Sequence, residues 1–383
     1  MIGLALAILA LLPAWAYLAC AVLASARFAR RRIEMQPLQP PVSVLKPLHG
    51  AEPGLYENLL SFAEQDYPAT QIVLGVRNAD DTAVPIARRL IRDQPSRDIT
   101  LVVDPRTSGS NLKIANLENM LGAARYRLLV LADSDMRVRR DYLAAVTAPL
   151  ADPGTGVVTC LYKGISSGGL WSDLGAMHIN FGFLPSALVG DMLGTGGGCF
   201  GATIALRQEV LERIGGFAPL RDELADDHRI GAAVRELGLA TVLSPFLVEN
   251  CVNEPSFASL WGHELRWART VRAMAPLGFV GSAITHGVAI AVLLALVSGM
   301  GLTGCGLVVI CCLLRWAAAG AIARRLGLPV RRLWLLPFRD LLSFAVFLGS
   351  FGGRNVHWRG QVLRVGPDGR MTVARAVEGD KVA

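Results

Sequence analysis

The stretch LLVLADSDMRV, residues Leu128 to Val138, leads from an apolar strand pattern directly into two aspartates, Asp133 and Asp135. Side chains alternate across a β-strand, so residues two apart share a face, and two carboxylates placed there repel each other unless something neutralises them. A surface turn is the simplest explanation, because Asp and Ser are ordinary turn residues after a strand. The surrounding sequence has to decide whether these carboxylates serve a turn or a ligand.

The sequence on both sides of this stretch alternates short β-rich runs with helical patterns, which predicts an α/β fold with a mostly parallel sheet. The predicted strands are Val42–Leu45, Gln71–Arg77, Ile99–Val103, Arg127–Ala132 and Gly156–Leu161, and the predicted helices are Leu55–Gln65, Ala83–Asp93 and Ile114–Ala124. Ligands of such sheets bind beyond the carboxyl ends of the strands. Asp81 lies shortly after the second strand, and Asp133 and Asp135 end the fourth. Both acidic sites therefore fall on the ligand-binding edge.

Residues 201–274 predict one more strand and three more helices. The segment Gly201 to Phe217 is typical of a strand followed by a helix that Gly215 ends. The next helical pattern has Asp226 and Asp227 in its first turn, where acids favour the helix dipole, so simple capping is an alternative to a chemical role. The third, SFASLWGHELRWARTVRAM, predicts a basic amphipathic helix capped by Ser256. Such a helix is typical of a membrane surface.

Two nearly uncharged runs indicate that part of the chain lies in lipid. Hydrophobic residues make up 52% of its 383 residues, which is high for a soluble protein. Ile2 to Ala24 and Val280 to Leu314 carry no charge and are long enough to cross a bilayer, the second more than once if it bends near Ser298 to Gly304. A signal peptide is the alternative for the first run. However, that run lacks a basic start, and Arg27 to Arg32 follow it, so we predict an uncleaved anchor with its basic end in the cytoplasm.

The net charge of +7 does not indicate a nucleic-acid partner, because the basic residues cluster beside apolar runs, at Arg27 to Arg32 and Arg324 to Arg332. Anionic lipid headgroups are the predicted partners instead. The seven cysteines include no CxxC pair and no Cys/His cluster. The sequence therefore predicts neither a zinc site nor a disulfide framework, which fits a reducing compartment.

Four motifs stand in the order RNADD, LADSD, LADDH and HELRW. Together they resemble the D, D, D, (Q/R)xxRW signature of family A glycosyltransferases. More closely, the sequence resembles the ceramide glucosyltransferase family (family 21 type) and its bacterial hopanoid-associated relatives. The resemblance begins near VSVLKPLHGAEPGLYENLLSFAEQDYP (42–68), continues through NLKIANLENM and reaches the final apolar runs. VTCLYKG, GGLW, FLPSAL and HELRWARTVR are most similar to the hopanoid-associated branch.

The resemblance implies a nucleotide-diphospho-sugar transferase domain with transmembrane helices before and after it, and it implies inverting transfer from a sugar nucleotide. Asp133 and Asp135 would hold Mg²⁺ or Mn²⁺, which bind oxygen ligands and bridge phosphates. A metal between them and the donor explains the carboxylate pair better than a turn does. Asp81 matches the first aspartate and would hold the nucleotide. Lys113 is a candidate for donor contacts, with a solvated surface lysine as the alternative.

The last two motifs supply the acceptor chemistry that the resemblance implies. Asp227 matches the third aspartate and would be the general base that takes the proton of the acceptor hydroxyl. Arg266 and Trp267 match the RW, and would fork onto diphosphate oxygens and stack on a ring. His263 stands where the motif usually has Gln or Arg, which leaves its contact with the diphosphate open. Asp226 replaces a glutamate, which leaves open which of the two acids is the base.

We expect a UDP-sugar donor and a membrane-lipid acceptor. The first choice is transfer of N-acetylglucosamine to a polyhydroxylated hopanoid such as bacteriohopanetetrol, and the second is transfer of glucose to ceramide. A processive polysaccharide synthase would need a longer set of membrane spans. A transporter would place ionisable groups inside its spans. Here the apolar runs are nearly uncharged, apart from Arg315 and the Arg339–Asp340 pair, and the acidic motifs lie in the α/β unit. A non-enzymatic scaffold is the remaining alternative.

The expected organisation places one catalytic unit between apolar segments at the bacterial inner membrane. Its parts are an anchor (1–26), a basic and Pro-rich linker (27–41), the catalytic domain (42–255), an interfacial helix (256–279), two transmembrane helices (280–323), a third apolar segment (333–351) and a basic tail (352–383).

We predict that residues 33 to 279 and the Arg324 to Arg332 loop face the cytoplasm, because basic residues flank the apolar runs on that side. The tail is also basic, so the segment 333–351, interrupted by Arg339 and Asp340, is expected to re-enter or to lie at the interface rather than to span. Reporter fusions after residue 32, in the loop and at the C-terminus measure this topology. A periplasmic C-terminus would contradict it.

Overall fold

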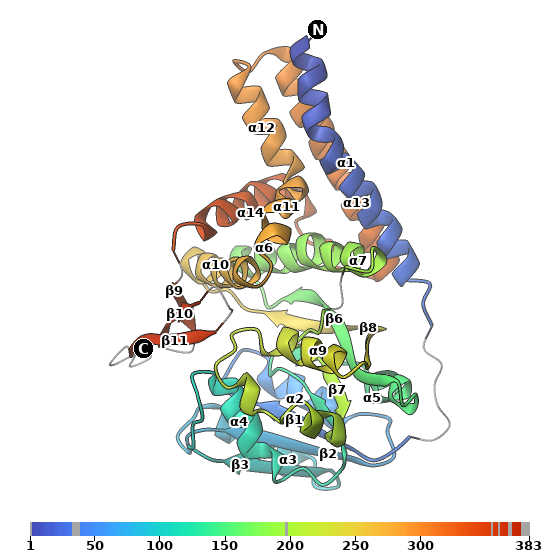
Figure 1. Ribbon diagram of the computed structural model, residues 1–383, viewed down its shortest axis with the longest axis vertical. Coiled ribbons are helices and arrows are strands. Elements are labelled where there is room, and N and C mark those ends of the chain that lie inside the picture. The colour runs from blue at the N-terminus through green and yellow to red at the C-terminus, as the bar shows by residue number, and fades with distance from the viewer. Residues whose placement is uncertain are drawn as a thin grey trace.

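The computed structural model describes residues 2–32, 39–195, 198–353, 355–358, 361–366 and 370–376. An α/β unit carries a layer of helices, and apolar helices rise from that layer (Figure 1). One eight-stranded mixed sheet organises the unit, in the order β3-β2-β1-β4-β7-β6-β8-β5. Its strands are β1 (Val42–Pro47), β2 (Thr70–Val76), β3 (Asp98–Val103), β4 (Leu128–Leu131), β5 (Met136–Arg137), β6 (Thr155–Ser166), β7 (Ile204–Arg207) and β8 (Ala240–Val252).

The parallel half of this sheet follows from its apolar strands. β1 pairs parallel with β2 and with β4, and β2 pairs parallel with β3. A central parallel strand is covered by helices on both faces, so apolar side chains are expected on both. In β1, Val44 packs in the core on one face of the sheet and Leu45 in the core on the other. β7 then pairs antiparallel with β4 and β6, while β6 and β8 run parallel. The mixed, mostly parallel sheet predicted from the sequence is confirmed.

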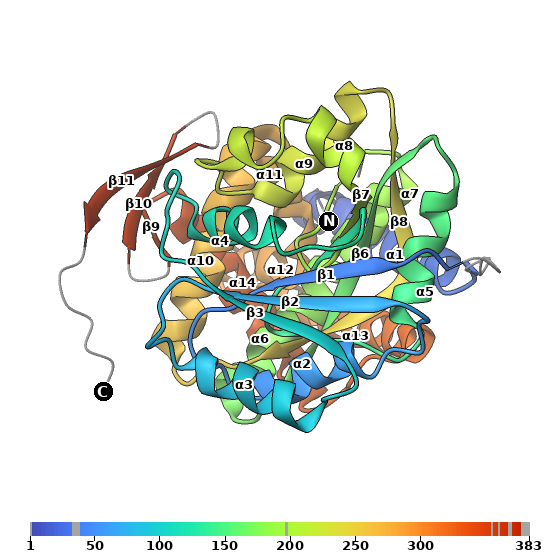
Figure 2. The same cartoon turned by 90° about the horizontal axis from the view of Figure 1, so that it is seen from below.

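Helices cover both faces of the sheet (Figure 2). One face packs against α2 (Leu55–Ala63), α3 (Ala83–Asp93) and α5 (Tyr142–Thr147), and the other against α4 (Leu112–Leu121), α8 (Gln208–Arg213) and α9 (Asp226–Glu236). Short 3-10 turns, η1 (Ala148–Ala151) and η3 (Ala218–Leu220), complete the unit. The predicted strands and helices are confirmed, with ends shifted by a few residues. Gly215 has a φ of 90° just after α8, as expected of a residue that ends a helix.

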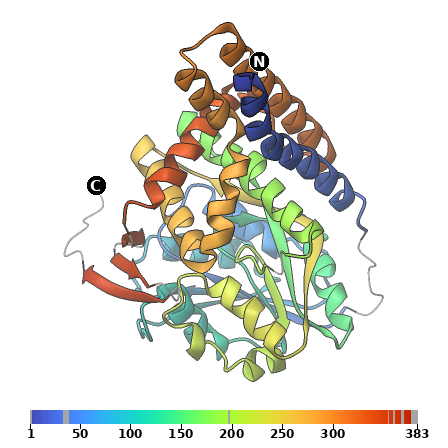
Figure 3. The same ribbon diagram turned by 45° about the horizontal axis from the view of Figure 1, so that its top comes forward.

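A helical layer separates this unit from the long helices (Figure 3). It consists of α6 (Leu170–His178), the π-helical turn η2 (Ile179–Phe183), α7 (Leu184–Met192) and α10 (Phe257–Met274). The first three form a nearly continuous helix that the sequence analysis did not assign. Leu184 and Leu188 on this helix share one apolar core with Ala21 and Ala24 near the N-terminus and with Ile322. The layer thus fastens the α/β unit to the apolar helices.

Among the residues that the structure describes, three helices are long and apolar enough to cross a membrane. They are Gly3–Phe28 in α1 (Ile2–Phe28), Leu302–Leu326, which is α13, and Leu333–Ser350, formed by η5 (Leu333–Leu335) and α14 (Leu336–Ser350). Between α10 and α13 lies a broken pair bent by 69°. It consists of α11 (Pro276–Gly281), η4 (Ser282–Thr285) and α12 (Gly287–Val297). The predicted bend in residues 298–304 is confirmed, because α12 ends and α13 begins there. α14 lies across the layer against α10 instead of beside α1 and α13 (Figure 1).

The basic tail contains a small antiparallel sheet that the sequence analysis did not assign. Its strands are β9 (Asn355–Trp358), β10 (Gln361–Val365) and β11 (Met371–Ala376), in the order β11-β10-β9. The Met371 N–H donates to the Asp222 carbonyl at 2.7 Å, and the Ser110 side chain donates to the Met371 carbonyl at 3.3 Å. The tail thereby contacts the two loops that precede α4 and α9. Those are the helices that carry Lys113 and Asp227.

Candidate active site

Lys113 joins two of the acidic motifs. Its ammonium nitrogen lies 2.7 Å from Asp133 Oδ1 and 3.5 Å from Asp226 Oδ2. Asn111 positions it, because the Asn111 side chain caps α4 by accepting from the Lys113 and Ile114 N–H groups. Burial lowers the pKa of Lys113, but the carboxylates of Asp133 and Asp226 outweigh burial and leave the pKa raised. Lys113 is only 12% exposed and is therefore not the solvated surface lysine that the sequence left open.

Asp133 and Asp135 lie at the carboxyl end of β4, as predicted, but their surroundings differ. Asp133 is paired with Lys113, and the buried Lys46 ammonium donates to the Asp133 carbonyl at 2.7 Å. Asp135 Oδ2 accepts from the Asn250 side chain at 2.6 Å, and Asp135 Oδ1 is buried with no hydrogen-bond partner among the described residues. Burial, and after it the carboxylates of Asp133 and Glu52, raise the pKa of Asp135 to about 7.

These two aspartates fit a divalent cation. An unpartnered, buried carboxylate oxygen beside a second carboxylate is costly alone and suits a hard cation that prefers oxygen ligands. The described residues contain no group of three or more His, Cys, Asp or Glu side chains placed to hold a metal. Two protein carboxylates are nevertheless sufficient where substrate phosphates complete the coordination shell, as Mg²⁺ sites commonly show. The metal site remains a prediction that this donor set supports.

The two carboxylates of the third acidic motif, LADDH, differ in their burial and contacts. Asp226 is buried and faces Lys113, with Asn111 Nδ2 3.5 Å from Asp226 Oδ1. Asp227 is less buried, and its Oδ2 accepts from the Gly201 N–H at 2.8 Å, while its Oδ1 accepts from the His228 N–H. Burial and the neighbouring Asp226 raise the pKa of Asp227 to about 6. Asp227 is therefore the member of the pair that a ligand can reach.

Asp81 lies apart from this cluster. Its Oδ1 accepts from the Gly50 N–H at 2.9 Å and from the Ala83 N–H at 2.8 Å, and His49 Nδ1 lies 3.6 Å from its Oδ2. The carboxylate thus ties the loop after β1 to the start of α3, at the carboxyl ends of neighbouring strands. This position is on the predicted edge, and the contacts with backbone N–H groups are structural.

The HELRW residues on α10 face the same region from the helical layer. His263 Nδ1 lies 2.7 Å from Glu254 Oε1, so its partner in the structure is a carboxylate. Burial raises the pKa of Glu254, but hydrogen bonds from His263 and Ser259 outweigh it and leave the pKa below its usual value. The Trp267 ring lies between the rings of His263, edge-on at 4.3 Å, and His178, stacked at 6.3 Å. The positive charge of Arg266 acts on Glu254 and on Tyr162.

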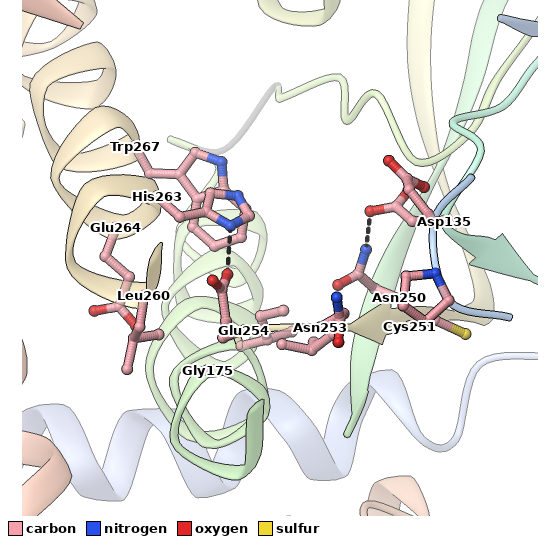
Figure 4. Close-up of a pocket in the computed structure, with 14 residues that line it drawn as sticks. Asp135, Gly175, Asn250, Cys251, Asn253, Glu254, Leu260, His263, Glu264 and Trp267 are labelled. Atoms are coloured by element: carbon pink, nitrogen blue, oxygen red, sulfur yellow. Dashed lines mark hydrogen bonds and ion pairs between the residues drawn. The ribbon is translucent and has the colours of Figure 1, made fainter. Parts of the chain in front are cut away.

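A cavity of about 160 Å³ connects the acidic edge with α10 (Figure 4). Asp135 and Glu52 line one end, and the other end is lined by Leu260, His263, Glu264 and Trp267. Residues of β8 and of the following segment, Asn250 to Glu254, form the wall between them. The structure therefore brings Asp135 and the HELRW motif to one cavity, although 127 or more residues separate them in sequence.

Sequence reasoning missed several residues of this site. Lys46, the second-last residue of β1, donates to the Asp133 carbonyl, and burial lowers the pKa of Lys46 to about 7. It could have been found, because a lysine at the carboxyl end of an apolar strand lies on the ligand edge. Gly201 could not have been found from the sequence, because its role is to leave room for two side chains. A Cβ atom at this position would lie 3.1 Å from Lys113 Nζ and 3.3 Å from Asp133 Oδ2. Asn250, the partner of Asp135, carries no local signal either.

Comparison with known proteins places this geometry in context. The sequence profile described as Glycosyl transferase family 21 matches residues 6–371. Ceramide glucosyltransferase 1 of Caenorhabditis elegans is 25% identical over 246 residues, covering 64% of this chain and 53% of that protein. Ceramide glucosyltransferase 3 of the same organism is 26% identical over 243 residues, covering 62% and 52%. The chain thus spans about half the length of the curated relatives it matches.

A solved structure of similar fold is the mannosyltransferase PcManGT from Pyrobaculum calidifontis, in complex with GDP-Man and Mn²⁺. It matches with a TM-score of 0.53 at 20% identity, over 91% of this chain and 99% of that chain. At this identity the likeness concerns the fold, and it confirms the glycosyltransferase-type sheet predicted from the sequence.

Proposed function

This chain belongs to glycosyl transferase family 21, and we propose that it transfers a sugar from a UDP-sugar to the hydroxyl of a membrane lipid with inversion. One observation carries the proposal: the acidic edge of the sheet shares a cavity with α10, which packs beneath helices suited to a membrane. A lipid whose tail stays among those helices can extend its headgroup toward the acids. A soluble acceptor would not need this arrangement.

The favoured reaction is transfer of N-acetylglucosamine to a hopanoid polyol such as bacteriohopanetetrol. The resemblance of VTCLYKG, GGLW, FLPSAL and HELRWARTVR to the hopanoid-associated branch supports this choice. The second candidate is glucosylation of ceramide, which the names of the C. elegans relatives favour. Both reactions need a cytoplasmic catalytic unit at the inner membrane, because nucleotide sugars are made in the cytoplasm.

On the donor side, Asp133 and Asp135 would hold Mg²⁺ or Mn²⁺, and Asp81 would hold the nucleotide. The bound ion would supply positive charge for the departing diphosphate. The PcManGT complex contains Mn²⁺, which supports a divalent ion here. Lys113 neutralises Asp133 and Asp226 and keeps both carboxylates in place beside the donor. Arg266, whose positive charge acts on Glu254 of the cavity wall, would bind diphosphate oxygens. His263 pairs with Glu254 and is better suited to positioning Trp267.

On the acceptor side, Asp227 would take the proton as the hydroxyl oxygen attacks the sugar carbon and the diphosphate leaves. The N–H groups of Gly201 and His228 orient its carboxylate. With a pKa of about 6, Asp227 is still ionised at neutral pH. Its pKa is also closer to the pKa of the acceptor hydroxyl than the pKa of an ordinary aspartate would be. One in-line displacement inverts the configuration without a covalent intermediate.

The deciding experiment gives the purified full chain each lipid with each donor. We expect sugar transfer from UDP-N-acetylglucosamine to bacteriohopanetetrol, detected by mass analysis of the lipid product. Transfer only from UDP-glucose to ceramide would reverse the ranking of the two candidates. Transfer to neither lipid with any UDP-sugar would remove the lipid-acceptor proposal.

The metal site predicts a loss of activity on ligand replacement. Asp135→Asn is expected to lower kcat by orders of magnitude, because an amide oxygen is a weaker ligand than a carboxylate, and EDTA is expected to abolish transfer until Mg²⁺ or Mn²⁺ is returned. Asn250→Ala, which removes only the partner of Asp135, is the control and should retain measurable metal-dependent activity. Full transfer in chelator would contradict the assignment.

The general base predicts both a variant and a pH effect. Asp227→Asn should fold and bind donor but lose roughly 10²–10⁴-fold in kcat. Since a protonated carboxyl cannot accept a proton, wild-type kcat/KM should fall as the pH drops below about 6 and level off above it. If the pH at which kcat/KM falls does not change when the metal concentration is raised, the titrating group is Asp227 rather than a metal ligand. An active Asp227→Asn beside an inactive Asp226→Asn would assign the base to Asp226.

A further inference from the structure

The cavity between the acidic edge and α10 has two ends that the proposed function treats differently. The reacting hydroxyl has to reach the proposed base Asp227, and the cavity approaches the acidic edge at the end lined by Asp135 and Glu52. The end lined by Glu264 and Trp267 then faces the remainder of the acceptor headgroup (Figure 4). This assignment of the two ends rests on the proposed function.

Glu264 is a buried carboxylate with only one oxygen paired. It is 3% exposed, and Arg339 of α14 donates to its Oε2. Ser343, one turn further along α14, accepts from Arg339 Nε at 3.2 Å and from Nη2 at 2.9 Å, which fixes the guanidinium. Oε1 of Glu264 has no hydrogen-bond partner in the described part of the chain. Nη1 of Arg339 is also buried without a described partner, so the ion pair leaves one accepting and one donating atom unpaired. An unpaired buried polar atom costs about 1–3 kcal/mol and more when charged, so a ligand hydroxyl that donates to Oε1 would offset that cost.

The wall of the cavity indicates the chemistry of that donor. Asp135 at the other end is the proposed metal ligand, and one N–H of the Asn250 amide already donates to it. Glu52 adds a further carboxylate. The end of the cavity near α10 therefore presents carboxylates, from Glu254 and Glu264, and disfavours a phosphate or carboxylate headgroup there through like-charge repulsion. Hydroxyl groups, which donate hydrogen bonds, fit this end of the cavity.

We propose that Glu264 is a specificity-determining residue whose Oε1 accepts a hydrogen bond from an acceptor hydroxyl other than the one that reacts. The enzyme thereby selects lipids whose headgroup carries several hydroxyls. A site built to bind a hydroxyl discriminates strongly against an analogue that lacks it, because the buried carboxylate is then left unpaired. Arg339 and Ser343 hold the carboxylate in register, so α14 contributes to acceptor recognition without lining the cavity.

The test compares Glu264→Gln with the wild-type full chain on two acceptors: bacteriohopanetetrol and an analogue that keeps only the terminal hydroxyl. Glutamine retains a carbonyl for Arg339 but replaces the accepting Oε1 with a donating amide. We expect kcat/KM for the tetrol to fall roughly 10- to 100-fold, the loss of one hydrogen bond to a charged acceptor. The value for the analogue should stay within about twofold, as should hydrolysis of the UDP-sugar without lipid.

Asp340→Asn is the matched control, because Asp340 is the neighbour of Arg339 on α14 and forms the other buried ion pair, with Arg315 at 2.8 Å. It is expected to lower thermal stability without changing the ratio of tetrol to analogue activity. An equal loss on both acceptors in Glu264→Gln, or an unchanged preference for the tetrol, would overturn the inference and make Glu264 a structural link only.

If the wild type uses ceramide instead, ceramide and its 3-deoxy analogue replace the pair, with the same expectations. A wild-type chain that glycosylates no lipid overturns the proposed function itself.

Discussion

The ammonium of Lys113 is the interaction on which the site depends. Asp133 comes from the end of a central strand and Asp226 from the first turn of α9, and Lys113 lies 2.7 Å and 3.5 Å from their carboxylates. Removing one partner from such a partly buried cluster leaves the others uncompensated, which typically costs several kcal/mol when burial is complete. The backbone also accommodates this cluster, because a Cβ atom at Gly201 would occupy the space next to Lys113 and Asp133.

A second constraint is the contact between the α/β unit and the apolar helices. Two buried ion pairs, Glu264–Arg339 and Arg315–Asp340, connect α10 to α14 and α14 to α13. Buried pairs contribute little net stability relative to apolar residues of similar size, but they fix register, since breaking one leaves an unpaired charge. In this fold the Glu264–Arg339 pair holds α14 against α10, and the Arg315–Asp340 pair holds α14 against α13. The acidic edge of the sheet and the helical layer therefore line one cavity.

Much of the fold and part of the site could be predicted from the sequence. The apolar runs of β1, β2 and β4, the helix at Ala83–Asp93 and the Ser256 cap depend on neighbouring residues, so local patterns identify them. The same holds for Asp133 and Asp135, because the end of a strand lies at a known edge of a parallel sheet. The nearly continuous helix from Leu170 to Met192 was missed. Its glycines and polar residues interrupt the period, and tertiary packing against α1 and α13 stabilises it.

The sequence by itself determined the family-type motifs, the alternation of strands and helices, the apolar segments and the order of the acidic groups. These features arise from interactions between residues close together in the chain, and each has a period or a motif that marks it. Only the tertiary structure decided that Lys113 neutralises Asp133 and Asp226, that His263 pairs with Glu254, and that Glu264 meets Arg339, 75 residues away. Such contacts are made when distant segments pack together. A side chain that finds its partner across a cavity leaves no periodic signal in the sequence around it.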